Sequence, residues 1–290
     1  MKFVRNFAVA AAVAMTAFGA ANVHAEDKIS EFRIGVLGGE NQSDRMRSNE
    51  CVRTKVEALL GVPTKIFAPA DYNGVIEGLI GRNLDMAWLG ASGYAKTYIT
   101  DPEAVEPVLV KINADGSMGY HSIGFARVDS GIKSLDDMKG KKFGFGDPNS
   151  TSGYLIPSIG EVVFTGGHEQ TIVAVANGDI DAGVTWADGL GAWEEGYNSG
   201  ALRKAADAGL VDMTQLVQIW KSKVIPEGPV VLRKDLPADV KLKVTGLIAG
   251  LASLDPECAY SFMAGEIKGM APVSHETYEV IIEARKRKMK

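Results

Sequence analysis

Short apolar strand patterns alternate with helical patterns along almost the whole chain, and this alternation restricts the fold more than any other feature. A first strand is expected at residues 32–37, followed by a helix at about 43–60. A second strand at 64–68 precedes a helix that Asp71 caps. Further strands are expected at 85–89, 108–112, 120–127, 142–145, 162–164, 182–185, 216–220 and 230–232, and further helices at about 134–139, 152–159, 168–177, 237–252, 256–264 and 276–288. Repeated strand–helix units are typical of α/β proteins, in which helices cover both faces of largely parallel sheets.

Two stretches rich in glycine and proline divide this pattern. They lie at residues 115–119 (Asp-Gly-Ser-Met-Gly) and 225–229 (Ile-Pro-Glu-Gly-Pro). A chain that crosses between two lobes at both places has a discontinuous lobe 1, residues 26–119 plus 228–290, and an inserted lobe 2, residues 120–227. Such lobes enclose a cleft that can close on a ligand by hinge motion.

The first 25 residues have the pattern of a secretory signal peptide. Lys2 and Arg5 precede an uncharged, largely apolar run from 7 to 22, and Val23-His24-Ala25 has the small-x-small pattern of a cleavage site. We therefore expect an exported protein whose mature chain begins near Glu26.

Charge and composition exclude some kinds of partner. The formal net charge is −5, and removal of the basic leader makes it more negative. A nucleic-acid-binding protein needs a basic surface to displace counterions, so we expect no nucleic-acid partner. The sequence has no Cys-x-x-Cys, His-Glu-x-x-His or histidine cluster, and we expect neither a metal site nor a cofactor.

The only two cysteines, Cys51 and Cys258, lie far apart in the sequence. In an exported chain they can form a disulfide, which would contribute roughly 4 kcal/mol of stability by restricting the unfolded chain. Two buried thiols are an equally good interpretation, and the sequence leaves both open.

The most informative local motif is Gly-Asp-Pro-Asn-Ser-Thr-Ser-Gly at residues 146–153. It places Ser150, Thr151 and Ser152 after a strand and a tight turn, where a helix begins. The first N–H groups of a helix lack intrahelical partners and carry partial positive charge, so added hydroxyls make such an end a receptor for an oxyanion. Ordinary N-capping by one hydroxyl is the alternative. Three hydroxyls followed by Gly153, which admits close approach, favour the anion site.

Six stretches of this sequence together resemble one known family. They occur in the family's order, between about residues 32 and 233: Phe67-Ala68-Pro69-Ala70-Asp71-Tyr72, Asp85-Met86-Ala87-Trp88, Ala114-Asp115-Gly116-Ser117-Met118-Gly119-Tyr120, Gly146-Asp147-Pro148-Asn149-Ser150-Thr151-Ser152-Gly153, Gly166-Gly167-His168-Glu169, and Ile219-Trp220-Lys221-Ser222 with Ile225-Pro226. The chain is similar to the phosphonate-binding proteins of bacterial phosphonate ABC importers. That resemblance implies the two-lobed type 2 periplasmic-binding-protein fold, an α/β fold with the ligand cleft between its lobes.

The resemblance also implies a role for each residue around the anion. Ser150, Thr151 and Ser152 would hold the phosphonate head, since hydrogen bonds to a charged oxygen are the strong ones. His168, at another junction between a strand and a helix, would donate to the same group. Tyr72 and Tyr120 correspond to family tyrosines that line the pocket, with phenol donors and apolar ring faces for the carbon chain.

At the far end of the ligand, two acids correspond to family residues that meet an amine. Asp188 occupies the position of one of them, although Asp is also a frequent helix cap. The second acid of the family follows Ile-Pro-Gly, whereas here Glu227 follows Ile225-Pro226 directly, a shift of one position. The two acids favour 2-aminoethylphosphonate as the ligand, and the shift of Glu227 weakens that expectation.

A second departure from the family concerns the connection behind the anion site. Residues 157–161 join the Ser-Thr-Ser helix to the strand at 162–164 almost directly, whereas a parallel crossover usually needs a dozen or more residues. We therefore expect a shortened helix or looser packing behind the hydroxyl turn.

We thus predict a periplasmic substrate-binding protein that captures a phosphonate by cleft closure and delivers it to a membrane permease. A receptor for phosphite, phosphate or a simple alkylphosphonate is the alternative within the same fold. A hydrolase with Ser150 or Ser152 as nucleophile and His168 as base is a less favoured hypothesis. It would need a strained Gly-x-Ser-x-Gly elbow or metal ligands, and the sequence has neither.

Overall fold

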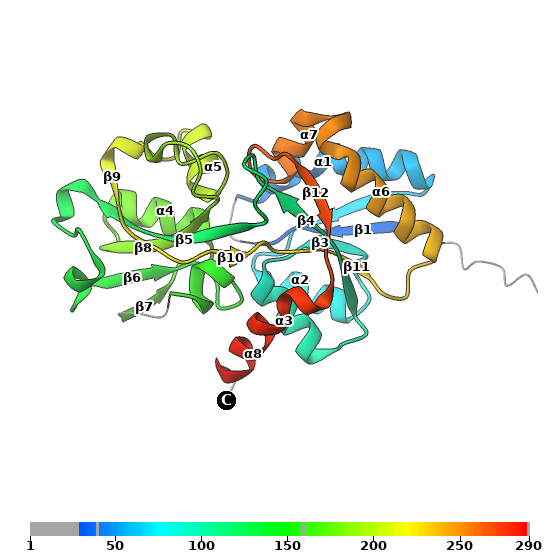
Figure 1. Ribbon diagram of the computed structural model, residues 1–290, viewed down its shortest axis with the longest axis horizontal. Coiled ribbons are helices and arrows are strands. Elements are labelled where there is room, and N and C mark those ends of the chain that lie inside the picture. Colours follow the sequence, from blue (N-terminus) through cyan, green and yellow to red (C-terminus); the bar gives the residue numbers. More distant parts are fainter. Residues whose placement is uncertain (1–28, 39–40, 158–160, 289–290) are drawn as a thin grey trace, which may run out of the picture.

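The structure is a computed structural model that describes residues 29–38, 41–157 and 161–288. The predicted signal peptide, residues 1–25, lies outside these ranges. The chain forms two α/β lobes, each built on its own mixed sheet, and the predicted fold class is confirmed (Figure 1). Among the described residues, no helix combines the length and apolar character that a membrane span needs.

The sheet of lobe 1 has the strand order β12-β4-β11-β3-β1-β2. Strands β1, β2 and β3 are parallel, and β11 pairs antiparallel with both β3 and β4. The elements of this lobe are β1 (Phe32–Gly35), α1 (Gln42–Leu60), β2 (Thr64–Phe67), α2 (Tyr72–Ile80), β3 (Met86–Trp88), α3 (Ala91–Thr100), β4 (Val105–Ile112), β11 (Val230–Arg233), α6 (Ala238–Leu254), α7 (Pro256–Phe262), β12 (Gly269–Pro272), the 3-10 turn His275–Tyr278 and α8 (Glu279–Lys288).

Alternation along the strands of lobe 1 supplies a hydrophobic cluster to each face of the sheet. Met86 packs in the cluster that α1, α6 and α7 cover, and its neighbour Ala87 packs in the cluster that α2, α3 and α8 cover. The two-sided burial explains why β3 is apolar at every position.

The sheet of lobe 2 has the order β10-β5-β8-β6-β7, and β9 also pairs with β5. Its elements are β5 (Gly119–Arg127), the 3-10 turns Val128–Ser130 and Leu135–Met138, β6 (Lys142–Phe145), the π-helical turn η3 (Thr151–Leu155), β7 (Glu161–Phe164), α4 (His168–Asn177), β8 (Ala182–Ala187), the 3-10 turn Trp193–Glu195, α5 (Ala201–Asp207), the 3-10 turn Met213–Gln215, β9 (Leu216–Lys221) and β10 (Ile225–Pro226). Strands β6, β7 and β8 are parallel, whereas β5 is antiparallel to β8 and β9.

The chain passes from one sheet to the other between β4 and β5, and it returns between β10 and β11 (Figure 1). These passages coincide with the two glycine- and proline-rich stretches of the sequence. At the return, a side chain on Gly228 would lie 2.1 Å from the Leu89 carbonyl oxygen, so only glycine fits there. We keep the predicted division, 26–119 plus 228–290 and 120–227, as our proposal for the lobe boundaries.

The helix predicted at 152–159 is shorter than expected. The described part of this segment, up to Pro157, forms only the π-helical turn η3, which ends at Leu155, and residues 158 and 159 lie outside the described residues. Strand β7 nevertheless pairs parallel with β6, in register from Lys142 to Phe145. The connection from η3 to β7 includes residues 158–160, which lie outside the described residues.

The two cysteines form a disulfide, which resolves the alternatives that the sequence left open. Cys51 of α1 and Cys258 of α7 are bonded with a Cα–Cα distance of 5.8 Å, within the normal range. The bond ties together two helices that cover the same face of the lobe 1 sheet.

Candidate functional site

A cavity of about 130 Å³ lies between the lobes and receives residues from both. From lobe 1 it is lined by the loop after β1, the end of β3 and the first residue of α2. From lobe 2 it is lined by η3 and by the first residue of α4. Ligand sites of open α/β sheets lie beyond the carboxyl ends of parallel strands, and this cavity follows that rule.

Seven of the eight residues predicted for the site line this cavity. They are Tyr72, Tyr120, Ser150, Thr151, Ser152, His168 and Glu227. Among the described residues that line the cavity, Asp188 does not appear. The structure therefore brings the predicted anion-binding residues together in this lining, together with one of the two predicted amine-binding acids, Glu227.

Ser150 shapes the hydroxyl turn. Its side chain accepts a hydrogen bond from the Gly153 N–H at 3.0 Å, which is the N-cap that the sequence offered as an alternative role. A Cβ on Gly153 would lie 2.8 Å from Ser150 Oγ and 3.0 Å from a carbon of the His168 ring. Glycine is thus required for the serine and the histidine to approach the same turn.

Thr151 connects the turn to lobe 1. Its hydroxyl oxygen accepts a hydrogen bond from the backbone N–H of Ser92 at 2.9 Å, in the first turn of α3. The N-cap of α3, Gly90, makes no side-chain cap bond and lines the cavity. The Thr151 proton can still be donated to a ligand, because the hydroxyl serves as the acceptor in this contact.

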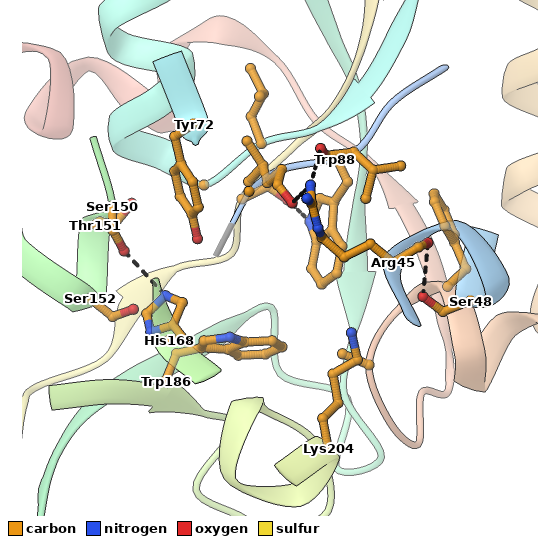
Figure 2. Close-up of a pocket in the computed structure, with 18 of the residues that line it drawn as sticks. Arg45, Ser48, Tyr72, Trp88, Ser150, Thr151, Ser152, His168, Trp186 and Lys204 are labelled. Atoms are coloured by element: carbon orange, nitrogen blue, oxygen red, sulfur yellow. Dashed lines mark hydrogen bonds between the residues drawn. The ribbon is translucent and has the colours of Figure 1, made fainter. Parts of the chain in front are cut away.

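His168 is the first residue of α4 and is held between two hydroxyls. Its Nδ1 lies 3.1 Å from Thr185 Oγ1, and its Nε2 lies 3.3 Å from Ser150 Oγ. Figure 2 shows the ring directly beside the hydroxyl turn, with the Tyr72 ring reaching toward it from the other lobe. The helix start adds backbone N–H groups and partial positive charge at this point.

Tyr120 completes the wall on the β5 side. Its phenol interacts with the side chains of Thr151 and Ser152. Burial, reinforced by the charge of Glu227, raises the pKa of Tyr120, so the phenol keeps its proton and can donate it. The predicted anion end therefore offers hydroxyl, phenol, imidazole and backbone donors, the chemistry that a phosphonate or phosphate oxygen requires.

Beyond the anion end, the cavity is walled by aromatic rings. Trp88 and Trp186 meet edge to face with ring centroids 6.0 Å apart, and Phe262 lies 6.4 Å from Trp88. Tyr120 packs against Trp186 in the same edge-to-face manner. Such a wall suits the carbon chain of a small ligand.

Two cationic side chains also line the cavity. Arg45 of α1 is buried, and its guanidinium donates to the backbone carbonyl oxygens of Leu37 and Pro69 at 3.0 and 2.9 Å. Lys204 of α5 extends toward Trp88 from the opposite lobe (Figure 2). The sequence analysis named neither residue, because Arg45 resembles an ordinary exposed cation on a predicted helix and Lys204 lies where no helix was predicted.

A buried charged cluster lies at the Glu227 end. Lys111 of β4 is fully buried, with its Nζ 4.0 Å from Glu227 Oε2 and 3.0 Å from Ser199 Oγ. Burial raises the pKa of Glu227, while Lys111 lowers it and Asp188 raises it further. Asp188 is itself buried and accepts a hydrogen bond from the Leu190 N–H at 3.1 Å. Lys111 was missed in the sequence, where the only signal was one lysine inside an apolar strand, residues 108–112.

No group of histidine, cysteine or acidic residues in the described part of the chain is arranged to hold a metal ion. A two-lobed α/β chain with a cavity between its lobes has the architecture of a periplasmic binding protein. The chain belongs to the family described as "ABC transporter, phosphonate, periplasmic substrate-binding protein", which matches residues 34–278. This is a family of binding proteins and not of enzymes, so the hydrolase hypothesis is not retained.

Two curated relatives are similar in sequence. The phosphonates-binding periplasmic protein of Escherichia coli is 31% identical over 239 residues, which cover 76% of this chain and 66% of the relative. The phosphate-import protein PhnD of Mycolicibacterium smegmatis is 30% identical over 212 residues, covering 66% of this chain and 63% of the relative. The matched part of the chain thus spans slightly less than two thirds of these relatives' length.

Two solved structures share the fold at lower identity. A binding protein component of an ABC phosphonate transporter from Pseudomonas aeruginosa has a TM-score of 0.75 and 24% identity, covering 89% of this chain and 86% of that one. PhnD1 from Prochlorococcus marinus, in complex with methylphosphonate, has a TM-score of 0.74 and 18% identity, covering 90% and 99%. These likenesses agree with the two-lobed architecture.

Proposed function

We propose that this chain captures a phosphonate in the periplasm and delivers it to the membrane permease of an ABC importer. The observation that carries the proposal is the turn Ser150–Ser152, which faces His168 in a cavity lined by both lobes. The name of the Escherichia coli relative and the predicted signal peptide, residues 1–25, support the same function.

The contacts between the lobes lie beside the proposed anion site, and this position supports ligand capture by lobe closure. Thr151 meets the Ser92 N–H across the cleft, beside the proposed anion position. Arg285 of α8 donates to the Pro148 carbonyl oxygen at 2.7 Å and to Asn149 Oδ1 at 2.6 Å. Closure therefore assembles the anion site and excludes water from it, which strengthens each hydrogen bond to the ligand.

For the group beyond the phosphonate, the sequence predicts an amine, as in 2-aminoethylphosphonate. Glu227 supports this ligand because it is an acidic residue of the cavity lining. Asp188, which is not among the described residues of that lining, gives it less support.

A receptor for phosphate, phosphite or a simple alkylphosphonate is the second candidate, and one observation favours it. Glu227 already has a cationic neighbour within the protein, because Lys111 Nζ lies 4.0 Å from its carboxyl group. Its charge therefore does not require an amine on the ligand. The Mycolicibacterium smegmatis relative carries the name of a phosphate-import protein, and the PhnD1 structure holds methylphosphonate.

Calorimetric titration of the exported protein with 2-aminoethylphosphonate, methylphosphonate, phosphite and phosphate tests both candidates. Tight binding of at least one phosphonate is expected, with a quench or shift of tryptophan fluorescence from Trp88 and Trp186. Tighter binding of phosphate than of every phosphonate would select the second candidate in its phosphate form. No binding of any of the four ligands would overturn the proposed function.

A further inference from the structure

Lys111 is unusual because it is a lysine with no solvent-exposed surface. A buried ammonium group is stable only when other groups compensate its charge and satisfy its donors. Three side chains surround it: Glu227 at 4.0 Å, Ser199 Oγ at 3.0 Å, and the Trp186 ring, whose centroid is 5.1 Å from Nζ. Ser199 and Trp186 belong to lobe 2 and Lys111 to lobe 1, so the cluster forms across the cleft.

Glu227 has both the cavity and Lys111 beside it. The residue is only 4% exposed and belongs to the cavity lining, whereas Lys111 does not appear among the described residues of that lining. The ammonium group therefore compensates Glu227 from inside the protein, behind the Trp186 ring. A ligand amine arriving from the cavity would meet a carboxylate that already has a cation beside it.

We propose that Lys111 is a positioning residue that sets ligand specificity: by compensating Glu227 from behind, it removes the attraction for a ligand amine. The site then selects a phosphonate or phosphate whose far end carries no positive charge. This inference rests on the proposed function, because it concerns the far end of the ligand whose anionic head binds at Ser150–Ser152.

The charges beside the Glu227 carboxyl group agree with this selection. Asp188 raises the pKa of Glu227, whereas Lys111 lowers it, so Lys111 is the neighbour that keeps this carboxyl group charged and compensates it. A ligand amine that reached Glu227 would also approach the Lys111 ammonium group, and like charges repel.

The test compares two ligands of nearly the same shape, 2-aminoethylphosphonate and propylphosphonate, which differ by an ammonium group in place of a methyl group. The wild-type protein is expected to bind propylphosphonate at least as tightly as 2-aminoethylphosphonate. In Lys111→Met, the ratio of the two affinities should move toward the amine by about tenfold or more, because like-charge repulsion is removed and Glu227 is left uncompensated. A merely structural loss would weaken both ligands and leave the ratio unchanged.

Two further variants keep the test decisive if Lys111→Met folds poorly. Glu227→Gln should move the ratio about tenfold away from the amine, because Lys111 is then the uncompensated charge. The double variant Lys111→Met/Glu227→Gln, which removes both charges, should return the ratio to within about threefold of the wild-type value. Lys139→Met, at an exposed lysine, controls for the loss of a positive charge from the protein.

A wild-type preference for 2-aminoethylphosphonate above tenfold would overturn the inference while leaving the proposed function intact. So would a folded Lys111→Met protein with an unchanged affinity ratio. If the wild-type protein bound methylphosphonate but neither of these two ligands, the specificity assigned to Lys111 would fail while the proposed function stood. If it bound none of the phosphonates, phosphite or phosphate, the proposed function itself would fail.

Discussion

The hydroxyl end and the Glu227 end of the cavity are both deeply buried, yet they are built from different chemistry. At the hydroxyl end, Ser150, Thr151 and Ser152 offer donors that carry no formal charge, and helix starts support them. At the other end, Lys111 and Glu227 are charged groups held 4.0 Å apart inside the protein. Neutral donors can remain buried in the unliganded protein, whereas buried charges must be compensated even when no ligand is bound.

In the proposed site, the two ends would recognise different parts of the ligand. The hydroxyl end would bind any tetrahedral oxyanion, and the charged end would determine which substituent the anion may carry. Variants at the two ends should therefore fail in different ways: those at the hydroxyl end lose all ligands together, and those at the charged end change the order of preference.

The largest effect is expected from Ser152→Asp, which places a carboxylate in the hydroxyl turn. Repulsion between the carboxylate and the anionic head should reduce the affinity for every phosphonate by more than about 100-fold, as measured by calorimetry. The milder Ser152→Ala should lose about tenfold, because it removes one hydrogen bond to a charged group. Ser253→Asp, an exposed serine of α6, is the matched control and should bind normally. Retained affinity in a folded Ser152→Asp protein would show that the head binds elsewhere.

A smaller loss, about 10- to 100-fold, is expected from His168→Ala. The variant removes a ring that lies 3.3 Å from Ser150 Oγ and 3.1 Å from Thr185 Oγ1, so it loses both a donor to the ligand and the support of the turn. The affinities for 2-aminoethylphosphonate and propylphosphonate should fall by the same factor. A change in their ratio would contradict the separation of tasks between the two ends.

The contact of α8 with lobe 2 should contribute about tenfold to affinity. Arg285→Met removes two hydrogen bonds to the 148–149 turn without touching the cavity, so the closed arrangement loses stability relative to the open one. Small-angle scattering with saturating ligand should show a larger fraction of open molecules. Arg287→Met, an exposed position on the same helix, should behave like the wild type. Equal affinities in the two variants would mean that α8 does not stabilise closure.

The smallest effect on binding is expected from the double variant Cys51→Ser/Cys258→Ser. The disulfide joins α1 and α7 within lobe 1, so its loss should lower the free energy of unfolding by about 2–5 kcal/mol while leaving ligand affinity within about twofold. Thermal unfolding measures the first quantity and calorimetry the second. A large loss of affinity would indicate that α7, which carries Phe262, needs the bond to keep the aromatic wall in place.

The sequence was sufficient for the strands and helices with strong patterns, including α1 and the parallel strands β1, β2 and β6. It missed α3 and α5. Helix α3 contains a glycine, an isoleucine and two threonines, so its intrinsic helix propensity is low, and packing against α2 and α8 supplies its stability. Strand β10 was missed because two residues are too few for a periodic pattern. Strand β12 was missed because it begins with Gly269 and ends with Pro272, two residue types that are depleted in strands.

The same limit applies to the cavity. The hydroxyl turn is one continuous motif, so the sequence could predict it together with the strand that ends there. The charged end is assembled from Lys111, Asp188, Ser199 and Glu227, which lie on different elements and meet only after both lobes have folded. A lysine inside an apolar strand pattern shows that a partner must exist, but only the structure shows that the partner is Glu227.

In the proposed mechanism, the contact between Thr151 and the Ser92 amide would make ligand binding and release one reversible movement. Because the threonine that would hold the anion is also a point where the two lobes meet, separating the lobes removes that support from the anion-binding turn and admits water to it at the same moment. A membrane permease that favours the open form would need no further interaction to release the ligand. The hydrogen bonds to the ligand would weaken in the same step that opens the cleft to solvent.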